Sequence, residues 1–341
     1  MRNYIPPFRP FRLYALDMVD YSIPFSDAVF KQARQRVSAH AYHTPLLTSR
    51  LLSERTGFEV RLKAEMFQRT GSYKLRGPLN KLLDLTEEER SRGVIGTSAG
   101  NHAQGLALAA QIYGIRSIVV MATNATPSKV EATKAYGAEV ILHGSIWDEA
   151  NEYALELIRK HGYTYVHPFD DPALIAGQST LGQELMEDWP EVDVIVAPIG
   201  GGGLISGTAL AAKHAKPSVK VIGVESSGAP GMRDSVRAGH VVTLPEVDCI
   251  IDGLRVKTVG TTTHRIISRY VDDIVTLPDS DIFEAVRWTM SHCKLVVEGA
   301  AAAPVAALLH GLVSAPKGSK VACVLTGGNI NLDQLKGLRW N

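Results

Sequence analysis

Short β-branched runs alternate with segments of helical period from about residue 93 onward. The first series is VIGTS, NHAQGLALAAQIYG, SIVVMA, TPSKVEATKAYG and EVILHG, and residues 163–167 close it. A second series runs through DVIVAPIG (193–200), LISGTALAAKHA (204–215) and KVIGVES (220–226), and VACVLTGG (321–328) is a further buried strand. Each parallel strand pair needs a crossover that covers a sheet face, so this alternation favours parallel sheets. The sequence predicts an α/β protein with two doubly wound parallel-sheet lobes.

Composition excludes several classes of partner. The 341 residues carry a formal net charge of +1 with 45% hydrophobic residues, which gives no reason to expect nucleic acid. No window offers the ~20 apolar residues of a membrane span. The cysteines Cys249, Cys293 and Cys323 lie far apart, so neither a disulfide framework nor a zinc site is favoured and we expect a cytoplasmic protein. Residues 1–24 contain four prolines and no long apolar run, which predicts an irregular arm.

Four consecutive glycines, Gly200 to Gly203, lie between a predicted strand and a predicted helix. Such a loop lets backbone N–H groups converge at a helix N-terminus, where the dipole favours a phosphate. A tight turn needs only one or two glycines, and four carry an entropic cost. A dinucleotide is the alternative ligand, since Glu225 lies near the distance at which such sites carry an acidic residue.

The segment TGSYK places Lys74 after a Gly-Ser turn and Tyr73. A lysine that acts as a nucleophile needs a lowered pKa, which burial or a nearby cation supplies. Periodicity alone does not separate such a residue from an ordinary surface lysine.

The segment GTSAGNHAQGLA (96–107) turns from a strand into a helix that opens at Asn101 and His102. Free N–H groups there, beside the Ser98 hydroxyl, suit a substrate carboxylate. The alternative is an ordinary N-cap by Ser98 with His102 as a structural helix residue.

Together and in this order, these segments resemble the fold type II, tryptophan synthase β-like, pyridoxal-5′-phosphate (PLP) enzymes of the serine/threonine dehydratase (threonine ammonia-lyase) family. The resemblance covers about residues 25–335 and includes a fourth segment, TGGN (326–329). It implies that Lys74 is the catalytic residue and holds PLP as a Schiff base, with Tyr73 packed near the cofactor.

The same resemblance assigns the other site residues. The substrate-binding residues are Ser98, Gly100, Asn101 and His102, and Asn101 also contacts the 3′-oxygen of the cofactor. The cofactor-binding residues are Tyr73, Lys74, Asn101, Gly200, Gly201, Gly202, Gly203, Leu204 and Thr326, with the glycines and Leu204 at the phosphate and Thr326 at the pyridine nitrogen. A neutral hydroxyl at that nitrogen leaves the ring a weaker electron sink, which favours elimination.

Two departures from the family pattern bear on the chemistry. Ala99 stands where serine racemases of the family carry a serine as proton donor, so we expect little racemisation. Glu225 and Ala229 match two parts of the family's metal site, but Gly231 lacks the carboxylate of the third. A monovalent or divalent cation is therefore possible at this site but is expected to bind weakly.

The resemblance implies PLP-dependent β-elimination of L-threonine or L-serine to a 2-oxo acid and ammonia. The alternatives are a serine racemase-type isomerase, a dehydratase for phenylserine, hydroxyaspartate or a hydroxyectoine-derived substrate, a PLP carrier, and, more distantly, an NAD-dependent oxidoreductase. The oxidoreductase rests on the glycine loop alone. Product analysis separates the PLP activities from one another.

We expect an N-terminal arm (1–24), a discontinuous large PLP-binding domain (25–88 and 168–341) and a small domain (89–167). The resemblance implies a homodimer or homotetramer that acts on a small amino acid. It ends a few residues before Asn341, from which we expect no domain that senses isoleucine and a catabolic role.

Overall fold

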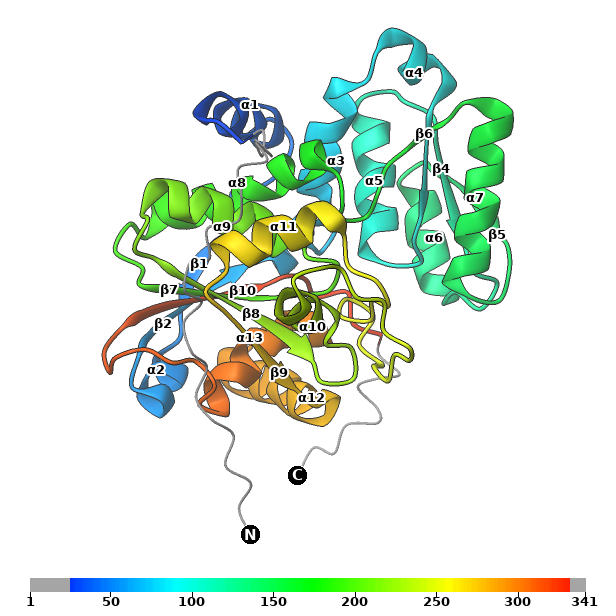
Figure 1. Ribbon diagram of the computed structural model, residues 1–341. Coiled ribbons are helices and arrows are strands. Elements are labelled where there is room, and N and C mark those ends of the chain that lie inside the picture. The colour runs from blue at the N-terminus through cyan, green and yellow to red at the C-terminus, as the bar shows by residue number, and fades with distance from the viewer. Residues whose placement is uncertain (1–24, 332–341) are drawn as a thin grey trace.

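The computed structural model describes residues 25–331, and the arm predicted for residues 1–24 lies outside this range. Figure 1 shows two lobes, each built around its own sheet. Within the described residues, no helix combines the length and the apolar character that crossing a membrane requires.

The larger lobe contains a six-stranded sheet. In spatial order its strands are β1 (Leu46–Thr48), β2 (Glu59–Ala64), β10 (Lys320–Leu325), β7 (Val194–Pro198), β8 (Lys220–Ser226) and β9 (Asp273–Leu277). All neighbouring strands are parallel except β1, which pairs antiparallel with β2. Side chains alternate between two apolar layers: Val194 and Val196 face one layer, and Ile195 and Ala197 face the other.

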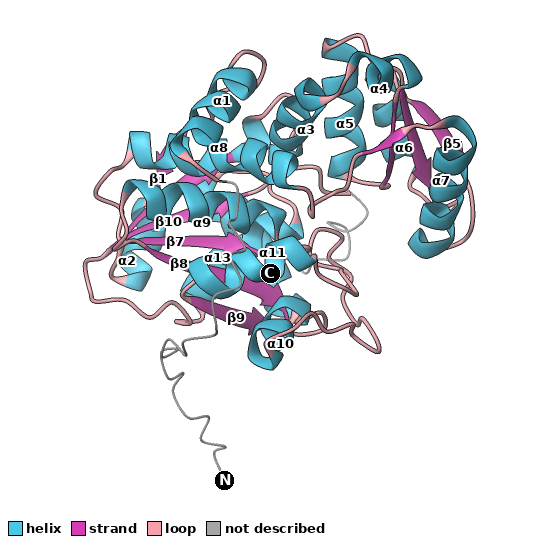
Figure 2. Cartoon of the chain, turned by 45° about the horizontal axis from the view of Figure 1, so that its top comes forward, coloured by secondary structure: helices cyan, strands magenta, loops and turns pink. Residues whose placement is uncertain are grey.

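Helices cover both faces of this sheet (Figure 2). One layer draws on α8 (Pro172–Asp188), α9 (Gly203–Ala215), α10 (Gly231–Ala238) and α11 (Thr261–Tyr270). The other draws on α2 (Arg50–Thr56), α12 (Asp279–Trp288) and α13 (Gly299–Leu309). Helix α1 (Asp27–Ser38) packs on α8. A π-helical turn, Thr289–Cys293, follows α12.

The smaller lobe contains a four-stranded parallel sheet in the order β5 (Glu139–Leu142), β4 (Ser117–Met121), β3 (Val94–Thr97) and β6 (Thr164–Tyr165). Its helices are α5 (Asn101–Ile112) and α6 (Pro127–Ala135) on one face and α7 (Trp147–His161) on the other. Helices α3 (Arg76–Lys81) and α4 (Glu87–Arg92) lead into it. The predicted pair of doubly wound lobes is confirmed, while the domain boundaries at 88/89 and 167/168 stay a prediction.

The parallel register brings three strand ends to one edge of the larger sheet. Strand β10 lies between β2 and β7, with Leu325 opposite Ala64 and Cys323 opposite Val196. The carboxyl ends of neighbouring parallel strands lie at the same edge, where ligands bind in open α/β sheets. The segments that follow β2, β7 and β10 carry Lys74, the four glycines and Thr326, so the fold alone brings them together.

Candidate active site

Lys74 lies in the 3₁₀ turn Tyr73–Leu75 that follows β2. The backbone N–H of Tyr73 donates to the carbonyl of Thr326 at 3.1 Å, which joins this turn to the end of β10. The ammonium of Lys74 donates to the carbonyl of Pro168 at 2.7 Å. Burial lowers the pKa of Lys74 to about 8, against the opposing attraction of the Glu298 carboxylate. An amine with this pKa has an appreciable neutral, nucleophilic fraction near neutral pH.

The glycine loop enters α9 in a conformation that side chains would not allow. Gly202 is the N-cap of α9 at φ +92°, in the left-handed region that favours glycine. A Cβ at Gly200 would lie 2.3 Å from the carbonyl oxygen of Gly253, and one at Gly201 would lie 2.2 Å from the ring of Phe169. These contacts explain why consecutive glycines are required. The loop presents backbone N–H groups at the start of a 13-residue helix, which suits a phosphate.

Thr326 follows β10 directly and is buried. Among the described residues its hydroxyl has no hydrogen-bond partner, and neither has that of Ser72 in the neighbouring turn. A buried hydroxyl without a partner costs free energy, so these atoms are suited to a ligand that supplies one. An amine with a lowered pKa, a glycine loop suited to a phosphate and a free hydroxyl together fit PLP.

Ser98, Ala99 and Gly100 form the loop that joins β3 to α5. The N-cap of α5 is Gly100 and no side chain caps the helix, while the Ser98 hydroxyl accepts from the N–H of Gly100 at 3.1 Å. The alternative reading, in which Ser98 is the N-cap, is therefore wrong. A helix N-terminus without a side-chain cap leaves N–H groups for a carboxylate.

Asn101 connects the small lobe to two segments of the large one. Its amide oxygen accepts from Nδ2 of Asn329 at 2.9 Å, and its Nδ2 donates to Glu298 Oε1 at 2.7 Å. Asn329 belongs to the TGGN segment and also donates to the carbonyl of Thr70 at 2.8 Å. The structure thus joins the segments around Lys74, Asn101 and Thr326 through direct hydrogen bonds.

His102 is buried and its contacts are internal. Its Nε2 lies 2.9 Å from the carbonyl oxygen of Val166, so this nitrogen carries the proton. Burial lowers the pKa of His102 to about 3, which keeps the ring neutral. The hydrogen bond from His102 to Val166 joins α5 to the segment that follows β6. A role of His102 in substrate binding stays a prediction.

Sequence reasoning missed Glu298. This residue is the N-cap of α13, and its carboxyl group lies in the site with a pKa raised by burial. Its one sequence signal is that it is the only acidic residue in the apolar run VVEGAAAAPVAALL (296–309). An isolated carboxyl group in such a run is costly to bury and indicates a polar partner, here Asn101.

The Glu225 carboxylate binds backbone N–H groups in the first turn of α10. Its two oxygens accept from the backbone N–H groups of Met232 and Arg233 at 2.8 and 2.9 Å, and burial raises its pKa to about 8. Ala229 lies buried nearby in the same β8–α10 connection. Across residues 25–331 no group of three His, Cys, Asp or Glu side chains could hold a metal ion. The cation predicted at Glu225 and Ala229 stays a prediction.

Known proteins are similar to this chain in sequence and in fold. Residues 37–327 match the family described as pyridoxal-phosphate dependent enzyme. An L-threonine ammonia-lyase of Thermotoga maritima is 47% identical over 305 residues, which are 89% of this chain and 76% of that protein. Maize serine racemase has a TM-score of 0.87 at 35% identity, covering 91% of this chain and 95% of that chain.

A processed threonine deaminase, isoform 2 of Solanum lycopersicum, also has a TM-score of 0.87, at 34% identity, covering 97% of this chain and 92% of that chain. The two TM-scores are equal, so the fold alone does not separate elimination from racemisation. The predicted fold and cofactor are confirmed: the chain belongs to the pyridoxal-phosphate dependent enzyme family and has the fold type II architecture.

Proposed function

We propose that the protein is an ammonia-lyase that removes water and then ammonia from L-threonine or L-serine. The observation that carries the proposal is the meeting of Lys74, the glycine loop and the free Thr326 hydroxyl at one sheet edge. The 47% identity to a protein named L-threonine ammonia-lyase supports this choice among PLP reactions.

Each group in the site has a proposed role. Bound PLP supplies an aldehyde for covalent attachment and a ring that withdraws electrons from the substrate α-carbon. Lys74 carries the cofactor between turnovers and, once exchanged for the substrate amine, takes the α-proton. Gly200 to Gly203 and Leu204 hold the phosphate, with Thr326 at the ring nitrogen and Tyr73 beside the ring.

The small lobe orients the substrate in this proposal. The uncapped start of α5, with Ser98 and Gly100, binds the carboxylate, and Asn101 lies between substrate and cofactor. This contact aligns the bond to the α-proton with Lys74. In net terms, the α-hydrogen and the β-hydroxyl leave as one molecule of water, and the unsaturated amine that is released reacts with water to give the 2-oxo acid and ammonia.

Racemisation is the second candidate, because maize serine racemase has an equally similar fold. A racemase needs a second proton donor on the face of the substrate opposite the lysine. Ala99, in the loop between β3 and α5, offers no such group. We therefore place elimination first.

The test is product analysis of the purified, PLP-loaded protein. Ammonia and 2-oxo acid are measured with threonine, serine, phenylserine and hydroxyaspartate, and D-amino acid is measured in the same reactions. We expect threonine or serine to give stoichiometric ammonia and 2-oxo acid. Ammonia release confined to a bulkier substrate, or D-amino acid as the main product, would refute the proposal.

Three further properties belong to this proposal. We propose a homodimer or homotetramer, which sedimentation measures. A cytoplasmic location agrees with the three free cysteines found among the described residues, which a reducing compartment would maintain. Weak cation binding at Glu225 and Ala229 is tested by measuring cofactor affinity with and without a chelator.

A further inference from the structure

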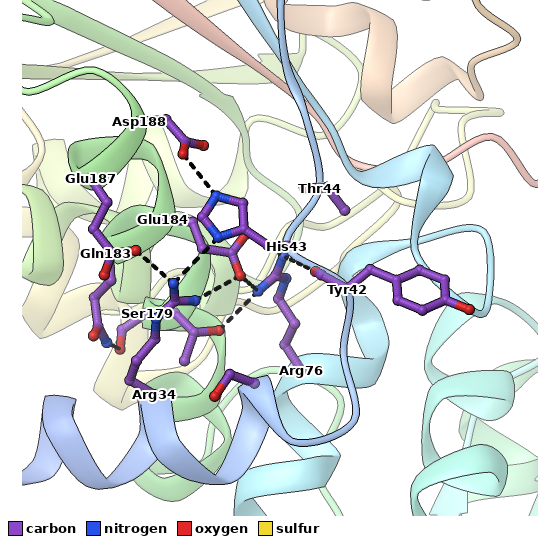
Figure 3. Close-up of polar contacts among 12 residues, drawn as sticks. Arg34, Tyr42, His43, Thr44, Arg76, Ser179, Gln183, Glu184, Glu187 and Asp188 are labelled. Atoms are coloured by element: carbon purple, nitrogen blue, oxygen red, sulfur yellow. Dashed lines mark hydrogen bonds and ion pairs between the residues drawn. The ribbon is translucent and has the colours of Figure 1, made fainter.

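A second ionic centre lies two residues beyond Lys74 and takes no part in the proposed chemistry. We call it the Arg76 cluster, and it consists of Arg34, Lys63, Glu65, Arg76, Glu184 and Asp188. The side chains of Lys63, Glu65 and Arg76 are fully buried. Figure 3 shows Arg76 and Arg34 converging on Glu184.

The guanidinium of Arg76 is bound on two sides. Its Nε and Nη2 donate to the two oxygens of Glu65 at 2.9 and 2.8 Å. Its Nη1 and Nη2 donate to the two oxygens of Glu184 at 2.8 Å each. Weaker contacts reach the hydroxyl of Thr180 at 3.2 Å and the carbonyl of Tyr42 at 3.3 Å. Two bidentate pairs fix the orientation of a planar group as no single ion pair does.

Arg76 and Glu184, which pair at the centre of the cluster, are both charged at neutral pH. Burial acts to raise the pKa of Glu184, but Arg76 and Lys63 together lower it to about 2. The carboxylates of Glu65 and Glu184 hold the pKa of Arg76 above its usual range despite burial. Removing one partner would leave a buried charge uncompensated.

The backbone around Arg76 is held by close contacts with two helices. A Cβ at Gly105 in α5 would lie 2.3 Å from the carbonyl oxygen of Lys74. A Cβ at Gly177 in α8 would lie 2.5 Å from the carbonyl oxygen of Arg76. Glycine at both positions lets α5 and α8 touch the turn itself. The Lys74–Arg76 turn is therefore enclosed by α5, α8 and the anchored guanidinium.

We propose that Arg76 is a positioning residue for Lys74: clamped between Glu65 and Glu184, it fixes the turn from which Lys74 reaches cofactor and substrate. This inference rests on the proposed role of Lys74. A base displaced by 1 Å costs about 100-fold in rate, so a rigid anchor two residues away affects turnover directly. Arg76 reaches no reacting atom and acts only through the backbone.

Lys63 distinguishes positioning from general stabilisation. Its ammonium donates to the carbonyl of Thr44 at 2.6 Å and pairs with Glu184 at 3.0 Å, so it is as deeply embedded in the cluster as Arg76. It lies on β2 and not on the Lys74 turn. If the cluster only stabilises the fold, removing either cation has the same kind of effect.

The experiment compares Arg76→Lys with Lys63→Met in the PLP-loaded protein. Lysine keeps the charge of Arg76 but has no planar fork. Methionine in place of Lys63 leaves Glu184 paired with Arg76 and Arg34. Steady-state kcat and KM and the absorbance of the lysine-linked cofactor are measured below the melting temperature of each variant. Amide hydrogen exchange of residues 73–77 is measured in the same PLP-loaded samples.

We expect Arg76→Lys to lower kcat by about 10- to 100-fold with a much smaller change in KM. Its cofactor absorbance shifts and exchange at residues 73–77 rises at least tenfold. Lys63→Met lowers the melting temperature and leaves these three readouts near wild type. Wild-type kcat and exchange in Arg76→Lys, or equal losses in both variants, would overturn the proposal.

A replacement variant covers the case in which Arg76→Lys does not fold, and a labelling experiment tests the proposed function separately. If Arg76→Lys does not fold, Glu65→Gln replaces it under the same criteria, since its amide oxygen holds the guanidinium with only one of two acceptors. Borohydride reduction and mapping of the labelled lysine in wild type test the proposed function separately. Failure of that labelling rejects the role of Lys74, whereas failure of the inference leaves the wild-type label on Lys74.

Discussion

Lys74 lies in the 3₁₀ turn Tyr73–Leu75 and Arg76 is the first residue of α3, only two residues later. The pKa of Lys74 is nevertheless lowered, whereas that of Arg76 is raised. Burial lowers the pKa of Lys74 to about 8, and the Glu298 carboxylate reverses this only in part. Burial also disfavours the charge of Arg76, but Glu65 and Glu184 outweigh it and raise the pKa. The difference lies in the number and distance of carboxylates, because burial acts in the same direction on both.

This contrast separates a structural cation from a reactive one. Arg76 receives two bidentate carboxylates and cannot lose its proton, so it serves as a fixed anchor. Within residues 25–331 the Lys74 ammonium has one hydrogen-bond acceptor, the carbonyl of Pro168, and it can become a neutral amine. A perturbed lysine beside a phosphate-binding loop is typical of a functional site, whereas a saturated arginine is typical of a core.

The largest effect is expected at Lys74 itself. Lys74→Ala removes both the cofactor attachment and the α-proton base, so we expect ammonia release to fall by about a thousandfold or more. Lys134→Ala, at an exposed lysine paired with Glu131, is the control and keeps wild-type turnover. Retention of more than a few per cent of activity by Lys74→Ala would contradict the assignment.

The second prediction concerns Glu184, one of the two carboxylates that hold Arg76. Glu184→Ala leaves Arg76 and Lys63 without their shared carboxylate, and breaking a buried pair in this way costs about 3–5 kcal/mol in the free energy of unfolding. Glu139→Ala removes the exposed partner of Arg116 and costs less than about 1 kcal/mol. Urea unfolding measures both, and equal losses would mean that the cluster is no stronger than a surface pair.

Much of the fold could be predicted because its strands are short apolar runs. Strands β3, β4, β7, β8 and β10 lie where the β-branched runs indicate them. Strand β2 has the sequence EVRLKA, whose polar–apolar alternation is typical of a strand with one exposed face, although Lys63 on the polar face is fully buried. It forms because β10 supplies parallel hydrogen bonds along its whole length and because the Lys63 ammonium finds carboxylates inside the protein. Tertiary contacts of this kind leave no local pattern.

The motifs of the candidate site could be predicted from the sequence, whereas the residues that contact and position them could not. Lys74, the glycine loop and Thr326 are candidate site residues on the basis of family resemblance and the phosphate-binding chemistry of glycine-rich loops, and the structure brings them to one sheet edge. The partners of Arg76 lie 11 residues before it and 108 residues after it in the sequence, and no spacing rule connects them. Glu298 was missed for the same reason, since only the folded chain brings it to Asn101.

The third prediction concerns the pKa of Lys74. In apoenzyme, the rate at which an amine-specific acylating reagent labels Lys74 should rise with pH with a midpoint near 8, because only the neutral amine reacts. The Glu298 carboxylate raises the pKa of Lys74, so Glu298→Gln should move the midpoint lower. Glu139→Gln is the distant control. A wild-type midpoint near the ~10.4 of a free lysine would show that burial does not act on Lys74.

The smallest expected effect concerns Ala99, which we expect to lie on the side of the substrate opposite Lys74. Lys74 is the only proposed base, so exchange of the α-proton should occur from one face, and L-serine should yield pyruvate with little D-serine. Ala99 is partly exposed in the loop between β3 and α5 and packs against the apolar layer of α5 and α6. Serine at this position adds one oxygen to the side chain.

Ala99→Ser should therefore raise the ratio of D-serine to pyruvate several-fold while the rate of pyruvate formation changes little, because the hydroxyl adds a proton donor without moving Lys74. Ala99→Gly alters the same loop without adding a hydroxyl and should leave the ratio unchanged. Chiral chromatography with a pyruvate assay on the same samples measures both products. Abundant D-serine from the unmodified protein would show that another group supplies the second base, and an equal rise in both variants would assign the effect to loop flexibility.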